Sequence, residues 1–185
     1  EKQNNLLIYY AGCKKSVKEF LIDNDFSNEK IKKKLSQSNN FFSAIIESKD
    51  KIICVSDFCR SFPIFYYKDK DLFIASNDAR ILKKKFKLKE ILTESVNECF
   101  LSGYVSGKRT LHKHLYQTEA LKFYKFNKLT KKLEINSFFF YHKKIKSNIK
   151  KIDALQKLDK VINKSIDRLV KKANKRTIII FMSGG

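Results

Sequence analysis

Residues 41–76 read FFSAIIESKDKIICVSDFCRSFPIFYYKDKDLFIAS, and this stretch predicts two consecutive β-hairpins. The apolar runs 41–47 and 51–56 are separated by a short polar turn, and the runs 64–67 and 72–76 by another. Consecutive hairpins indicate an antiparallel sheet. Because the runs are too continuously apolar for a sheet with one wet face, we expect helices or a second sheet to cover both faces.

Further elements are expected on both sides of the hairpins. The apolar run 6–11 ends before a glycine, as a buried strand does before a turn, and Ser27 is a suitable N-cap for a short helix. Apolar residues at helical spacing predict a helix over 88–101 and a second helix of about 19 residues that begins at the N-cap Asp153. Two more strands are expected, at 121–126 and 133–141.

The composition bounds the class of protein. The chain has 185 residues and is 43% apolar, enough for one core and the beginning of a second. It contains no apolar run of the length that a membrane span needs and no secretory signal pattern, so we expect a cytoplasmic protein without a membrane partner. The cysteines form no C-x-x-C pair, and we expect them to be buried hydrophobes and not metal ligands.

The charge leaves two classes of function open. Lys+Arg 40 against Asp+Glu 19 gives a formal net charge of +21. Only five of the basic residues are arginine, whose planar guanidinium is the group that reads bases and phosphates. The lysine excess therefore favours a solvated surface over nucleic-acid recognition. A basic, non-enzymatic module that binds RNA or another polyanion stays open as the alternative function.

The end of the chain carries a chemical signal. A short continuous apolar run predicts a fully buried, parallel-type strand at 177–182, and Ser183, Gly184 and Gly185 follow it. Because glycine lacks a Cβ atom, the backbone N–H groups of such a turn can approach a phosphate or pyrophosphate. A first parallel strand needs neighbours to pair with, so we expect this chain to be the front piece of a longer protein.

Three segments, in chain order, form a signature. Residues 57–67 read DFCRSFPIFYY and lead into the strand 72–76, residues 100–113 read FLSGYVSGKRTLHK, and residues 181–185 read FMSGG. The first is similar to R-D-x-x-G-x-x-P-L-Y-Y followed by F-A-S-E, the second to L-x-x-G-Y-x-x-G-x-x-T-L-F-K, and the third falls where L-S-G-G-L-D-S is found. In this order the segments resemble the asparagine synthetase (glutamine-hydrolysing) family.

The resemblance implies two domains. Residues 1–145 would form a glutaminase-like domain of the class II amidotransferase type. Its fold would be α+β, a four-layer α/β/β/α sandwich like that of the N-terminal nucleophile hydrolases. Residues 146–185 would begin an α/β ATP-pyrophosphatase (synthetase) domain with a helix and its first strand, truncated at the phosphate loop.

The same resemblance implies ATP-dependent amide synthesis. Such a synthetase activates a carboxylate, for example that of aspartate, as its adenylate, and ammonia, free or released from glutamine, displaces AMP. Ser183, Gly184 and Gly185 would bind the pyrophosphate portion of ATP, with Mg²⁺ offsetting its charge. The Asp and Ser that should follow lie beyond Gly185, so this piece alone should not catalyse adenylation. The family norm suggests a homodimer.

The glutaminase signature is incomplete. The family's nucleophile is an N-terminal cysteine whose α-amino group serves as base, whereas Glu1 stands first here and the nearest cysteine, Cys13, is internal. The stretches R-G-P-D and N-G-E-I-Y-N that hold glutamine in relatives are absent, and Ser56 and Arg60 stand where the family has Arg and Gly. Either an upstream segment was lost or the domain is a degenerate glutaminase. We favour the second and expect no catalytic residue in this chain.

Three residues of the first segment have structural interpretations. Asp57 precedes a strand and has no carboxylate or histidine partner near it in sequence, so we expect it to cap a turn and not to act as an acid or base. Tyr66 and Tyr67 occupy strand positions. We expect them to pack in the core and not to form a platform for a nucleobase.

Overall fold

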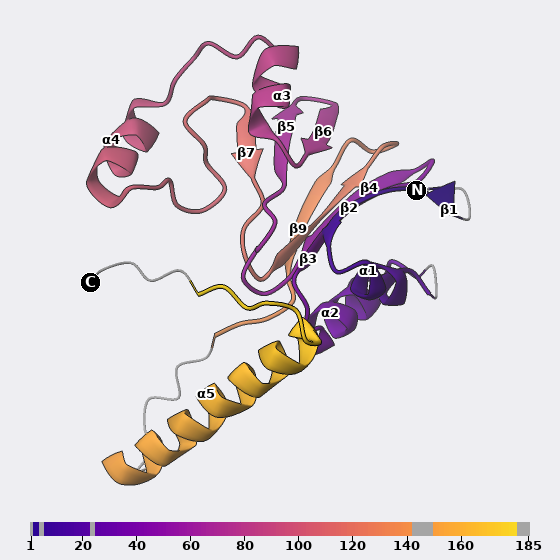
Figure 1. The fold of residues 1–185 in the computed structure, drawn as a ribbon. Helices are drawn as coiled ribbons and strands as arrows, with labels where there is room; N and C mark the ends of the chain where they lie inside the picture. The colour runs from indigo at the N-terminus through magenta and orange to yellow at the C-terminus, as the bar shows by residue number, and fades with distance from the viewer. Residues whose placement is uncertain (1, 4–5, 23–24, 142–149, 181–185) are drawn as a thin grey trace. The chain divides into compact units, whose positions relative to one another are not determined.

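A computed structural model describes the whole chain apart from residues 1, 4–5, 23–24, 142–149 and 181–185 (Figure 1). The chain divides into two compact units, 1–141 and 142–185. In the described residues, the first unit holds two antiparallel sheets and four helices, and the second holds one long helix. The α+β class is confirmed. The expected domain boundary at 145/146 lies outside the described residues.

The larger sheet has six strands, all paired antiparallel. Its first predicted hairpin is confirmed: β3 and β4 pair with Ile46 opposite Ile53, and the turn between them is closed by a hydrogen bond from Ser48 N to Lys51 O of 2.9 Å. Turn residues with short polar side chains favour this reversal. The strands, in spatial order, are β1 (Lys2–Gln3), β2 (Leu6–Gly12), β3 (Phe42–Glu47), β4 (Lys51–Ser56), β8 (Lys122–Asn127) and β9 (Leu133–Ser137).

The smaller sheet has three strands, in the order β6 (Leu72–Ser76), β5 (Phe65–Asp69) and β7 (Leu115–Gln117). The second predicted hairpin, β5–β6, is confirmed, and the short β7 was not predicted from the sequence. β5 is the central strand, so β6 and β7 are the two edges of this sheet.

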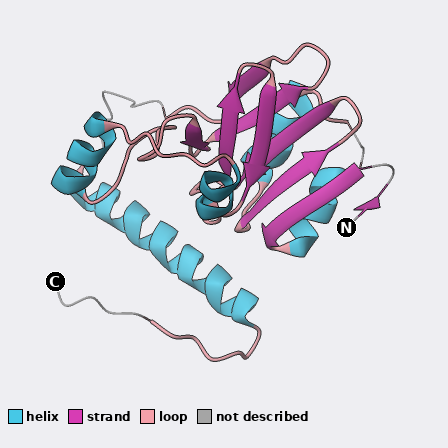
Figure 2. Cartoon of the chain, turned by 90° about the horizontal axis from the view of Figure 1, so that it is seen from above, coloured by secondary structure: helices cyan, strands magenta, loops and turns pink. Residues whose placement is uncertain are grey.

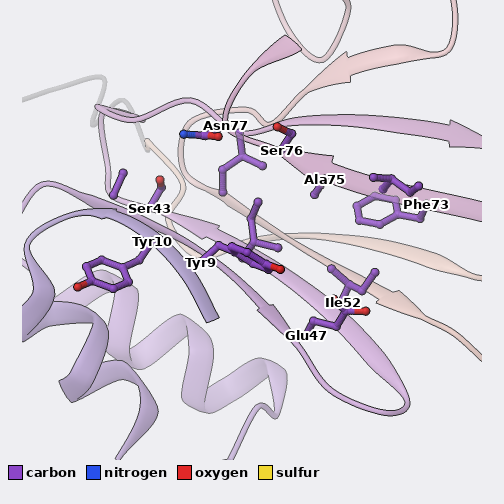
Figure 3. A pocket seen from close by; sticks show the side chains of 13 residues that line it. Tyr9, Tyr10, Ser43, Glu47, Ile52, Phe73, Ala75, Ser76 and Asn77 are labelled. Carbon is purple, nitrogen blue, oxygen red and sulfur yellow. The ribbon is translucent and has the colours of Figure 1, made fainter. Parts of the chain in front are cut away.

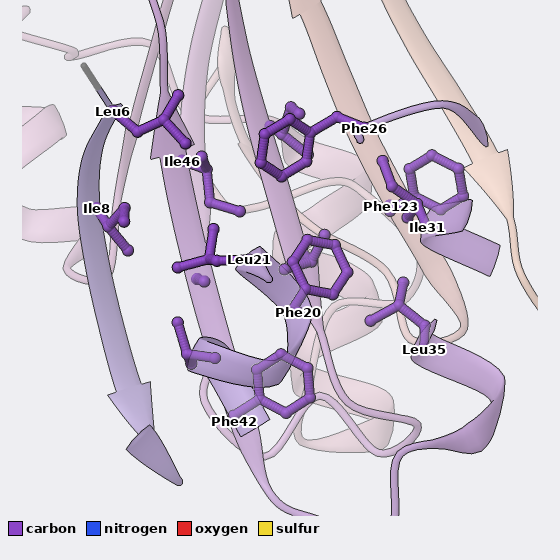
Figure 4. Packing of buried hydrophobic residues seen from close by; sticks show 14 of the residues in the cluster. Leu6, Ile8, Phe20, Leu21, Phe26, Ile31, Leu35, Phe42, Ile46 and Phe123 are labelled. Carbon is purple, nitrogen blue, oxygen red and sulfur yellow. The ribbon is translucent and has the colours of Figure 1, made fainter. Parts of the chain in front are cut away.

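One core lies between the larger sheet and two helices, α1 (Lys14–Leu21) and α2 (Asn28–Gln37). α2 begins after Ser27, as predicted, and its apolar pair Ile31 and Leu35 is fully buried against the sheet (Figure 4). This spacing of four residues places both side chains on one face of the helix. α1 was not predicted, because its apolar residues are too few to stand out from the surrounding lysines.

The second core lies between the two sheets and is largely aromatic. The buried ring of Tyr66 packs on Phe73, Tyr116 and Tyr124, with ring centroids 5.2–5.5 Å apart. This confirms the core interpretation of Tyr66. On the far face of the smaller sheet lies α3 (Ala79–Lys85), whose Leu82 is buried there.

The helix expected over 88–101 is shorter in the structure. α4 (Thr93–Ser102) starts five residues later and ends, as expected, at a glycine in the left-handed region, Gly103 with φ 81°. Residues before it pair with another segment: Leu92 N donates to Leu111 O, and Lys113 N donates to Glu90 O. These backbone groups cannot form helical bonds at the same time.

The second unit contains α5 (Lys151–Ala173), which confirms the predicted long helix (Figure 2). The predicted N-cap, Asp153, was wrong: the N-cap is Lys150, and Asp153 lies in the first turn, where its carboxylate complements the helix dipole. No helix among the described residues is long and apolar enough to cross a membrane.

The strand expected at 177–182 is not found in the described part of that segment. Residues 177–180 have no strand assignment, and the side chains of Ile178, Ile179 and Ile180 are exposed. A strand needs a neighbour for its backbone groups, and no described strand pairs with this segment. Residues 181–182 lie outside the described residues. The strand predicted at 133–141 is shorter in the structure: β9 begins at Leu133 and ends at Ser137.

Candidate binding cleft and the turns beside it

A cleft of about 600 Å³ opens between the two sheets of the first unit (Figure 3). One wall comes from β2, β3 and β4 of the larger sheet, and the other from β6 and the residue that follows it. Aromatic and aliphatic side chains alternate along it with a few hydroxyl and amide groups, a mixture typical of ligand sites. The lining residues are Tyr9, Tyr10, Ala11, Ser43, Ile45, Glu47, Ile52, Ile64, Phe73, Ile74, Ala75, Ser76 and Asn77.

The cleft carries little net charge. Among the described residues that line it, only Glu47 is charged at neutral pH. Its Oε1 lies 2.6 Å from Lys128 Nζ, which also donates to the backbone oxygen of Ser48. This ion pair offsets the single carboxylate charge.

Among the described residues, the lining holds no thiol, imidazole or amine. A nucleophile with an adjacent base is the arrangement that hydrolysis of an amide by covalent catalysis requires. Cys54 lies in the core between the sheets, and burial raises the pKa of its thiol to about 12, so it stays protonated. Cys13 is the N-cap residue of α1 and is not part of the lining.

Ser56 shows what replaces the arginine of the family motif. It lies directly opposite the cleft residue Ser43 in the β3–β4 register, and both side chains are buried. The Oγ atom of Ser56 has no hydrogen-bond partner among the described residues. A hydroxyl cannot pair with a carboxylate as a guanidinium does, so this position offers no cationic anchor for an amino-acid ligand.

Asp57 organises the turn after β4. Its buried carboxylate accepts hydrogen bonds from Phe42 N at 3.0 Å, from Cys59 N at 2.9 Å, and from Ser61 through both N and Oγ. The turn is thereby fixed to the start of β3. The predicted capping role of Asp57 is confirmed.

Arg60 occupies the position at which the family motif has glycine. Its backbone adopts φ 54°, in the left-handed region that glycine favours and that residues with a Cβ atom rarely adopt. The guanidinium donates through one nitrogen to Gln117 Oε1 at 2.8 Å and to Thr118 O at 2.7 Å. These bonds offset the cost of the unusual conformation, which is about 1 kcal/mol for a residue with a Cβ atom.

Gln117 joins the first sequence segment to the second. While its Oε1 accepts from Arg60, its Nε2 donates to Val105 O at 2.9 Å and its backbone N donates to Lys108 O at 2.9 Å. Residues 57–67 and 100–113 are thus held together through one side chain. Sequence analysis missed Gln117, because it lies outside both motifs and amide side chains carry no local pattern.

Glu98, a residue of α4, fixes the loop that follows this helix in the segment 100–113. It accepts a hydrogen bond from Ser106 N at 3.0 Å and forms an ion pair with Arg109 at 2.9 Å, which ties α4 to the loop after it. Hydrogen bonds from Ser106 first, and the charge of Arg109 second, lower the pKa of the Glu98 carboxyl below its ordinary value.

The expected phosphate-binding residues Ser183, Gly184 and Gly185 lie outside the described residues. Among the described residues, no group of three or more His, Cys, Asp and Glu side chains is placed to hold a metal ion.

Comparison with known proteins gives a distant likeness to solved structures. No protein-family model matches the chain, and no curated protein matches it. Among solved structures, a glutamine phosphoribosylpyrophosphate amidotransferase from B. subtilis, solved with ADP and GMP, is 11% identical with a TM-score of 0.40. The match covers 76% of this chain, and this chain spans 31% of that one. The likeness identifies neither a substrate nor a reaction for this chain.

Proposed function

We propose that this chain is the front part of an ATP-dependent, amide-forming synthetase similar to the asparagine synthetases. The observation that carries the proposal is the junction at Gln117. Two segments that resemble one family's motifs, and that lie more than thirty residues apart in the sequence, bond to the same side chain. Motifs that match only by chance would have no reason to meet in space.

The first unit is proposed to be a reduced form of the four-layer sandwich of N-terminal nucleophile hydrolases. Helices on the outer face of the larger sheet, the aromatic core between the sheets and α3 on the outer face of the smaller sheet support this arrangement. The segment between β2 and β3 is short, only 29 residues, and contains two helices and no strand among its described residues. Among the described residues, β6 is one edge of the smaller sheet.

The first unit is also proposed to be inactive as a glutaminase. The described cleft lining holds no cysteine and no histidine or amine that could act as its base, and a serine, Ser56, stands where the family motif has arginine. The protein would then take its nitrogen from free ammonia.

For the second domain, Ser183, Gly184 and Gly185 are proposed to hold the pyrophosphate portion of ATP. Their backbone N–H groups suit this role because neither glycine has a Cβ atom, and this support comes from the sequence alone. Mg²⁺ bound with ATP would offset the charge of the phosphates. The carboxylate substrate is proposed to be a small amino acid or a related acid, with aspartate the first to test.

Exchange of labelled pyrophosphate into ATP by the full-length protein tests this function. We expect exchange that depends on a carboxylate and is reduced at least a hundredfold by Gly184→Val, while Ser36→Ala, at an exposed position of α2, leaves it unchanged. We further expect amide synthesis from ammonia and none from glutamine. Absence of exchange across a panel of carboxylates would overturn the synthetase proposal. Ammonia release from glutamine would overturn the inactive glutaminase.

A further inference from the structure

The edge strand β6 borders the cleft along its backbone. Residues 73–77, five in succession, all line the cleft. Because successive side chains of a strand point to opposite faces, a run of five lining residues requires that the backbone edge itself contributes to the wall. β6 pairs only with β5 among the described residues, so every second residue directs its N–H and C=O groups outward from the sheet.

This edge lacks the usual protection against pairing with another strand. The sequence of β6 is LFIAS, with no charge and no proline, and β5 and β6 pair in continuous register over five residues. The other described edges differ: β9 carries the charged residue Glu134, β7 has only three residues and β1 only two. An apolar edge that is unpaired among the described residues is a place where an extended segment can add as a further strand.

The opposite wall offers places for side chains. Tyr9, Ile45 and Ile52 line the cleft from three neighbouring strands of the larger sheet, β2, β3 and β4. Figure 3 shows Tyr9 and Ile52 at this wall. A strand added to β6 would direct every second side chain toward this wall. Ser43, Ser76 and Asn77 gather toward one end of the cleft, where they could bond to the end of such a segment.

Charge decides the kind of occupant. Because Lys128 pairs with Glu47, the cleft presents no free charge to a ligand. A free amino acid or a nucleotide would leave its charges unpaired there, which is costly in a partly buried site. The interior of a peptide has no charge of its own, and its amide groups match the unpaired groups of β6.

We propose that the cleft binds an extended, uncharged peptide segment of a partner protein, which adds to β6 as a fourth, antiparallel or parallel strand of the smaller sheet. The segment spans about five to seven residues, to match the length of β6. Apolar side chains at alternate positions contact Tyr9, Ile45 and Ile52. The proposal concerns only the first unit and does not depend on the synthetase function.

Selection from a display library of random linear nine-residue peptides on the full chain tests the proposal. Ala75→Leu narrows the cleft beside β6, and Ala154→Leu, the same change on exposed α5, is the control. We expect selected peptides to bind the wild-type chain and Ala154→Leu equally and Ala75→Leu at least tenfold more weakly. Circular dichroism shows whether each variant is folded. Failure to recover a peptide that distinguishes the variants overturns the proposal.

Backbone methylation of a selected peptide gives a second test. Because it uses the wild-type chain, its result does not depend on whether a variant of the protein folds. N-methylation at every second residue removes the N–H groups of one edge only. We expect at least a tenfold loss of affinity for one of the two alternating sets and little change for the other, and equal effects would overturn strand addition. Dimerisation of the chain that Ala75→Leu abolishes would also overturn it, because β6 would then pair with a second copy.

Discussion

Replacement of the buried Asp57 by alanine should destabilise the first unit, because its carboxylate fixes the turn after β4 to the start of β3. The carboxylate accepts four hydrogen bonds, and one donor, Phe42 N, belongs to a residue that is only 1% exposed. A buried N–H group left without a partner costs about 1–3 kcal/mol. The bonds from Cys59 and Ser61 are nearer to solvent, and water can replace part of them.

We therefore expect Asp57→Ala to lower the free energy of unfolding by about 2–4 kcal/mol. Asp57→Asn retains one accepting oxygen for Cys59 and Ser61 but turns an amide nitrogen toward Phe42 N, so its loss should be about half as large. Asp78→Ala is the matched control, because Asp78 also accepts from a backbone N–H group, that of Arg80, at an exposed helix start. Its loss should be the smallest of the three.

Urea unfolding followed by tyrosine fluorescence reports these losses of stability for the first unit, residues 1–141. The chain has eight tyrosines and no tryptophan, and all eight tyrosines lie at or before Tyr141. With a slope of about 2 kcal/mol per molar urea, Asp57→Ala should shift the midpoint by about 1–2 M. If Asp57→Ala and Asp78→Ala shift the midpoint equally, the carboxylate does not hold the turn to β3 and the reasoning fails.

Three other outcomes are expected. Gly12→Ala should lower the free energy of unfolding by about 2–4 kcal/mol in the same assay, because φ at Gly12 is +83° and an added Cβ would overlap a backbone oxygen and an aromatic ring. Thermal melting from pH 6 to 3 should show wild type more stable than Glu98→Gln above the ordinary pKa of 4.5. That difference should shrink as pH falls through the lowered pKa of Glu98, since its stabilisation is present only while the carboxyl is ionised. Iodoacetamide at pH 8 should label exposed Cys59 in the native chain and spare Cys54, whose pKa of about 12 keeps the thiol protonated; mass spectrometry of peptides would show equal labelling if the burial of Cys54 were wrong.

Local patterns were sufficient for the elements whose own residues decide their structure. The two hairpins 41–56 and 64–76 were predicted because each has a polar turn between two β-rich runs, and α5 because its apolar residues recur at helical spacing. The helix expected over 88–101 was too long at its start because residues 88–92 bond to a segment some twenty residues later. Such long-range pairing leaves no trace in a local window.

The candidate site was predictable only in part. The sequence identified Asp57 as a turn residue, and the structure confirms it, but the cleft itself could not be predicted, since it is formed by strands from both sheets. Gln117 could not be found either, because its importance depends on where Arg60 and Val105 lie. The phosphate loop at 183–185 stays a prediction.

Arg60 and Gln117 are tied to each other in a way that should be visible across evolution. With arginine at position 60, the strained backbone is tolerated because the guanidinium donates a hydrogen bond to the side-chain oxygen of Gln117. With glycine at position 60 there is neither strain nor a donor, and position 117 is released to vary. In close homologues, residues 60 and 117 should therefore covary: arginine at position 60 should occur with a hydrogen-bond acceptor at position 117, and glycine at position 60 with a wider range of residues there.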